Sequence, residues 1–165
     1  MLQRDAVSFA ELLAHTQQES QRWQQWFNVH PEALELKIDI AHSKAVRELL
    51  YHIFFVDRRF AEWLAGDSLT APENIAHFTC ANLFAVENTA IAKFRFVLEK
   101  SELAAWDHMI IFPKPMEGLQ ASRRKCFLHA IVHGIRHWAQ LATALRVAGY
   151  SQDWQHDFLL SPAME

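Results

Sequence analysis

The stretch that decides the fold is residues 119–148, which read LQASRRKCFLHAIVHGIRHWAQLATALRVA. Its apolar residues recur every three or four positions and no proline interrupts them, which predicts one long amphipathic helix. Gly149 follows directly, in the position where a glycine commonly ends a helix.

Three further stretches have the same periodicity, and most of the glycines and prolines lie between them. They are residues 8–28, which open with a capping-box sequence SFAE, residues 42–65, and residues 70–100. Residues 103–116 are expected to form a structured connection, and residues 34–40 alternate in a way that suits extended backbone, but no convincing set of strands is present. We therefore predict an all-α fold, a single domain over residues 1–165 in which four long helices form a bundle.

The composition is that of an ordinary globular chain: of its 165 residues 51% are hydrophobic and 21% are charged, with a formal net charge of −3. Such a chain has no overall basic field, so we expect neither nucleic acid nor an anionic membrane surface as a partner. No apolar run is long enough to cross a bilayer, and the first residues lack the pattern of a secretory signal. The two cysteines form neither a CxxC pair nor a disulfide framework, so the expected location is the cytoplasm.

Three of the ten histidines, His129, His133 and His137, follow one another at intervals of four. Residues four apart lie about 40° apart around a helix and about 6 Å apart along it, so two of these imidazoles can share one metal ion. All three cannot easily do so, because the outer two are about 12 Å apart. We expect His133 and His137 to point into the bundle and His129 to flank them at the polar edge. The residues that share the face of His137 are apolar: Cys126, Ala130, Leu141, Ala144 and Ala148.

A third ligand should come from another helix, and His52 is the candidate. It lies at the margin of the apolar face of residues 42–65, within about 40° of Val56 and Trp63. Glu48, one turn before it, offers a carboxylate that could support a ligand. A histidine in this position is also typical of the edge of a core. The spacing alone therefore leaves open whether His52 is a metal ligand or a core-edge residue.

Several kinds of site are excluded by their motifs. Gly134 stands where a zinc protease of the HExxH type needs its glutamate, and the chain has no Glu-x-x-His spacing for a di-iron centre. Haem-attachment, phosphate-loop and nucleophile-elbow motifs are absent as well. What remains is a single mononuclear site rich in histidine.

The pattern resembles the DinB/YfiT-like family of candidate metalloenzymes. The resemblance rests on ELLYHI at residues 48–53, on HxxxH at residues 133–137, and on LRVAG at residues 145–149. It implies a four-helix bundle with a metal ion held by His52, His133 and His137. The family often continues its last motif as HRGQ, whereas this chain has HWAQ at residues 137–140, so a substrate or anion contact from that arginine is not carried over.

Some members of this family are transferases or isomerases that use a low-molecular-weight thiol, and this is the leading function that the resemblance implies. Three protein ligands leave a position open on the metal, where a thiol would lose its proton and attack an electrophilic substrate. Glu48, His129 and His108 are the candidates for the general base. Zinc is the expected ion, with nickel, and then iron or manganese, as alternatives. Six Trp and twelve Phe also suggest a homodimer that joins through a helix face.

Two other readings stay open. One is a metal-binding or small-ligand-binding stress protein without turnover, and the other is a set of histidines packed in the core without metal. A cavity lined by side chains such as Trp63, Phe112 or Trp138 that opens onto the ion would favour an enzyme. A fourth protein ligand would favour a structural role.

Overall fold

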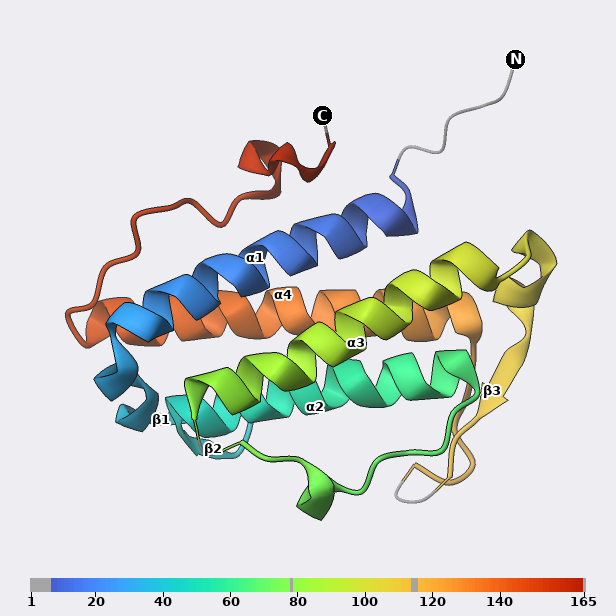
Figure 1. Cartoon of the computed structure of the whole chain (residues 1–165), viewed down its shortest axis with the longest axis horizontal. Helices are drawn as coiled ribbons and strands as arrows, with labels where there is room; N and C mark the ends of the chain where they lie inside the picture. Colours follow the sequence, from blue (N-terminus) through green and yellow to red (C-terminus); the bar gives the residue numbers. More distant parts are fainter. Residues whose placement is uncertain (1–6, 78, 114–115, 165) are drawn as a thin grey trace.

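Four long helices make up most of the computed structural model, which describes residues 7–77, 79–113 and 116–164 (Figure 1). They are α1 (Phe9–Val29), α2 (Val46–Ala65), α3 (Cys80–Lys100) and α4 (Arg123–Val147). Helix α2 packs against both α3 and α4, and α1 packs against the same two helices from the other side. The prediction of a mainly helical chain with four long helices is confirmed.

Local side chains explain where these helices begin and end. At the start of α1 the predicted capping box is present: Ser8 Oγ accepts from the Glu11 amide at 3.2 Å, and Glu11 accepts from the Ser8 amide at 2.7 Å. Thr79 and Ser122 cap α3 and α4 in the same way. Helix α2 ends at Gly66, whose φ of 75° favours glycine.

Two pairs of short antiparallel strands correct the prediction that the chain has no convincing strands. β1 (Lys37–Ile40) pairs with β2 (Ser43–Ala45), and β3 (Met109–Ile111) pairs with β4 (Gln120–Ser122). Because these strands take up residues that had been assigned to helices, α2 begins at Val46 instead of residue 42. For the same reason α4 begins at Arg123 instead of residue 119.

Helix α3 also begins later than predicted, at Cys80 instead of near residue 70. Thr70 does not cap it, because the Thr70 amide and hydroxyl both donate to the Glu62 carboxylate on α2. The structured connection expected over residues 103–116 is present in its described part, and residues 114 and 115 lie outside the described residues. Short 3₁₀ turns lie in the connections. These turns are η1 (Pro31–Glu35), η2 (Pro72–Asn74), η3 (Leu103–Asp107), η4 (Phe158–Leu160) and η5 (Pro162–Met164).

The buried apolar side chains form two clusters along the length of the helices, one containing Phe54 and Leu83 and the other containing Phe60 and Phe94. Along their helices, Asp57 of α2 and Glu87 of α3 lie between the residues of one cluster and those of the other. Asp57 is only 4% exposed and Glu87 only 1%. Among the described residues, no helix has the length and apolar composition needed to cross a membrane.

Candidate metal centre

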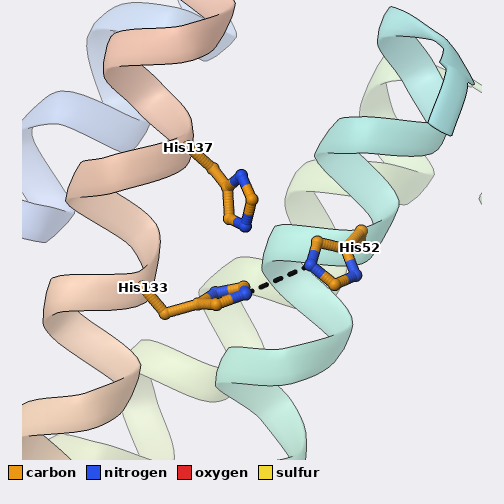
Figure 2. A group of neighbouring side chains, drawn as sticks. All are labelled: His52, His133 and His137. Atoms are coloured by element: carbon orange, nitrogen blue, oxygen red, sulfur yellow. Dashed lines mark hydrogen bonds between the residues drawn. The ribbon is translucent and has the colours of Figure 1, made fainter. Parts of the chain in front are cut away.

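Helices α2 and α4 bring three histidines together (Figure 2). His133 and His137 project from successive turns of α4, and His52 faces them from α2. One nitrogen from each ring lies within 4.8 Å of the other two. Nε2 of His52 and Nε2 of His133 are 3.1 Å apart. The structure thus joins the three residues that the sequence and the family resemblance pointed to.

Burial differs among the histidines of α4 in the way that the helical arithmetic predicts. His133 is 8% exposed and His137 is 2% exposed, whereas His129 is on the surface. Burial lowers the pKa of His52, His133 and His137, that of His133 to about 3, and the neighbouring histidines add to the effect for His52 and His133. The three rings are therefore uncharged at neutral pH, the state in which imidazole binds a metal.

The partners of His137 determine which of its nitrogens is free to bind. Nδ1 lies 2.7 Å from Oε1 of Gln140, an oxygen that can only accept, so Nδ1 carries the proton. Nε2 keeps its lone pair and accepts from the Arg136 guanidinium at 3.0 Å. A metal-ligating histidine is commonly held in this way through its other nitrogen.

The donor set fits a divalent metal ion of intermediate softness. Two nitrogens bound to one tetrahedral zinc lie about 3.3 Å apart, close to the separation of the His52 and His133 Nε2 atoms. Within the described residues this group has three histidines and no fourth protein ligand, which is the composition of an open site. Nδ1 of His133 is buried without a hydrogen-bond partner among those residues.

The structure separates the three candidates for a general base. Glu48 is exposed and accepts from the Lys44 amide at 2.6 Å, so it helps to start α2. His108 is exposed at the end of η3, where its carbonyl accepts from the Arg123 amide. His129 alone contacts the cluster, with its ring centroid 5.8 Å from that of His133.

Along α4, one hollow lies before His133 and another lies after His137. A small one is lined by residues that include Phe60, Phe112 and His129, and a shallow one is lined by residues that include Ile40 and Gln140. Of the three aromatic residues expected at a cavity, Phe112 lines the small hollow and Trp63 packs against Phe112. Trp138 lines neither of these two hollows, because it is buried in the core and stacks on Trp23.

Sequence reasoning missed two features of the centre. Arg136 contacts His137 directly, and its position just before that histidine was an available signal. Phe60 lies two turns after His52 on α2, about 80° around the helix, and its ring contacts that of His129. A larger cavity, lined by Arg22, Trp26 and Trp154, lies between α1 and the segment after α4 and includes none of the three histidines.

Comparison with known proteins gives one clear result. A search of the curated proteins found no match. A model of the DinB family matches residues 1–163, nearly the whole length of the chain. With four long helices in order and a histidine cluster that could hold a metal ion, the chain belongs to the DinB family.

Proposed function

We propose that His52, His133 and His137 hold one divalent metal ion, and that the protein is a metal-dependent transferase for a low-molecular-weight thiol. The observation that carries the proposal is the convergence of three uncharged imidazoles from two helices, with their nitrogens within 4.8 Å of one another. Zinc suits this donor set best, and nickel, iron or manganese could occupy it as well.

The proposed reaction joins the sulfur of the thiol to an electrophilic carbon of the second substrate. The S–H bond breaks, a C–S bond forms, and the leaving group departs with the electron pair of its own bond to carbon. A divalent cation at this position would lower the pKa of a thiol that approaches it. An isomerisation that uses the thiol as a carrier would need the same first step.

Two side chains of α4 have the position to assist. His129 contacts His133 and is the candidate acceptor for the thiol proton. The Arg136 guanidinium, 3.0 Å from His137 Nε2, is the cation nearest the cluster and suits an anionic group of a substrate. Both are exposed, so a substrate can reach them.

The test is a conjugation assay with defined substrates. Zinc-loaded protein is mixed with chlorodinitrobenzene and, in turn, with glutathione, bacillithiol, mycothiol or cysteine, and the thioether is followed by its absorbance. We expect turnover with at least one thiol and its loss in a folded His137→Ala variant. Metal binding without turnover for any thiol would instead support the rival function, a metal-binding or small-ligand-binding stress protein.

We infer that residues 1–165 form one domain, that its helices form the bundle typical of the family, and that the protein works in the cytoplasm, where free Cys80 and Cys126 would stay reduced. A homodimer is supported by an exposed apolar stripe on α4, made of Leu128, Val132 and Ile135. A Val132→Glu variant should then be monomeric by light scattering; an unchanged mass would argue against this face.

A further inference from the structure

A small apolar pocket lies about one turn of α4 away from the histidine cluster, with His129 in its lining. Its volume is about 150 Å³, roughly that of a cavity that holds one benzene ring. The described lining comes from three parts of the chain: α2, residues 112, 116 and 119–121 of the β3–β4 hairpin, and the first turns of α4. The side chains that line it are mainly apolar: Phe60, Phe112, Met116, Leu119, Gln120, Ala121, Lys125, Cys126 and His129.

His129 connects this pocket to the cluster. Its ring centroid is 4.9 Å from that of Phe60, a wall of the pocket, and 5.8 Å from that of His133. Residues 129 and 133 are one turn apart, so the pocket is displaced from the cluster by about 6 Å along α4. A molecule with a short spacer between its two ends can occupy the pocket and still reach the histidines.

The chemistry of the walls selects an uncharged group. Among the described residues of the lining, only Lys125 is charged, and it is exposed, so its charge stays at the mouth. Cys126 is almost completely buried, and burial raises the pKa of its thiol, so it forms part of the wall as a neutral group. Phe60 and Phe112 present aromatic rings about 6.0 Å apart, in an edge-to-face arrangement.

We propose that this pocket binds the apolar end of the electrophilic substrate, a group the size of a single phenyl ring or a branched alkyl chain. The proposal rests on the proposed function, because it assigns the pocket to one of the two substrates of that reaction. It narrows the electrophile to a small amphipathic molecule, whose reactive carbon lies toward His133 and whose apolar group lies beyond His129.

The test measures binding, independently of turnover. Fluorobenzene is titrated into the full-length, zinc-loaded protein and followed by ¹⁹F NMR. We expect saturable binding that weakens at least tenfold in Ala121→Leu, which fills the pocket. The matched control Ala139→Leu makes the same change in the shallow hollow on the other side of the histidines and should bind as the unaltered protein does. No saturable binding, or equal binding in Ala121→Leu, would overturn the proposal.

A second variant covers the case in which Ala121→Leu does not fold. Met116 is only half-buried, so Met116→Ala should enlarge the pocket at little cost in stability. Fluoronaphthalene should bind this variant at least tenfold more tightly than it binds the unaltered protein, and an unchanged affinity would contradict the proposal. If fluorobenzene binds but no thiol is conjugated, the pocket stands and the proposed transferase activity fails.

Discussion

Nε2 of His52 lies 3.1 Å from Nε2 of His133, although the two residues are 81 positions apart in the chain. Both rings are uncharged, so without a cation one nitrogen must donate a proton and the other must accept it. A metal ion would use the lone pairs of both nitrogens, so the donating ring would have to move its proton to Nδ1. This pair, with His137 beside it, is the feature on which the predictions about metal binding and turnover depend.

Gln140 should strengthen metal binding through His137. Its Oε1 accepts the Nδ1 proton at 2.7 Å and so fixes the orientation of the ring and leaves Nε2 free. Gln140→Ala is expected to weaken zinc binding by about 10- to 100-fold. Competition with a coloured chelator measures the change. Thr143→Ala, an exposed change one turn further along α4, is the control; equal affinity in the two variants would show that Gln140 has no such role.

Arg136 should oppose metal binding and favour an anionic substrate. Its guanidinium donates to the same nitrogen that would bind the ion, and its charge repels a cation. Arg136→Ala is expected to bind zinc about two- to fivefold more tightly, since an exposed charge pair is worth up to about 1 kcal/mol. The KM for an anionic electrophile should rise at the same time. Arg146→Ala, on the last turn of α4, should change neither quantity, and weaker zinc binding in Arg136→Ala would contradict the account.

His129 should affect turnover and leave metal content unchanged. It contacts His133 but lies outside the group of three, and it is the candidate acceptor for the thiol proton. His129→Gln is expected to lower kcat by roughly 100-fold with the zinc content unaltered. The measurement is a kinetic titration of thiol, paired with elemental analysis of the same sample. Loss of zinc from this variant would mean that the residue supports the metal instead.

Asp57 and Glu87 should make the free energy of unfolding depend on pH. Burial raises the pKa of both carboxyls, that of Glu87 to about 8, and the facing Glu87 raises that of Asp57 further. Because the folded pKa of Glu87 lies above the unfolded value, its contribution is complete in acid and is lost as the pH rises through about 8. Between about pH 6 and pH 9 the protein should lose roughly 1 to 3 kcal/mol of stability.

Glu87→Gln tests this directly, because the amide keeps the shape of the side chain and cannot ionise. Urea unfolding of this variant should vary less with pH over the same range, with the dependence that remains coming from buried Asp57. Glu99→Gln, an exposed change on the same helix, should follow the unaltered protein. A pH dependence that is the same in all three proteins would show that the buried pair is not its source.

The four long helices could be predicted because their apolar residues repeat at the helical period over many turns. The capping box also marked the start of α1, but the starts of α2, α3 and α4 could not be predicted, because residues just before them form strands or longer-range hydrogen bonds. The Phe112 amide donates to the Leu119 carbonyl, and the Arg123 amide donates to the His108 carbonyl, so residues 119–122 pair with the preceding strand and do not join α4. The helix predicted from residue 70 begins at Cys80 instead, because Thr70 bonds to Glu62 on α2, and this preference is not visible in a local pattern.

The candidate site likewise has residues that could be predicted from the sequence and residues that could not. His133 and His137 could be paired from sequence because one helix fixes their separation and their burial. His52 needed the family resemblance, since nothing local states which face of α2 meets α4. The pocket beside His129 depends on the hairpin folding back against both helices, and the Asp57–Glu87 pair depends on the register of α2 against α3. Contacts between separate helices and strands leave no periodic pattern in the sequence.

The most direct test of the central claim is the metal content of protein purified without a nickel column, measured by elemental emission before and after chelation and reloading with zinc. We predict one zinc per chain for the unaltered protein and for His42→Asn, an exposed histidine in the β1–β2 turn. We predict less than a tenth of that for folded His133→Ala. A protein that takes up no metal, or a His133→Ala variant that binds as much as the unaltered chain, would contradict the account.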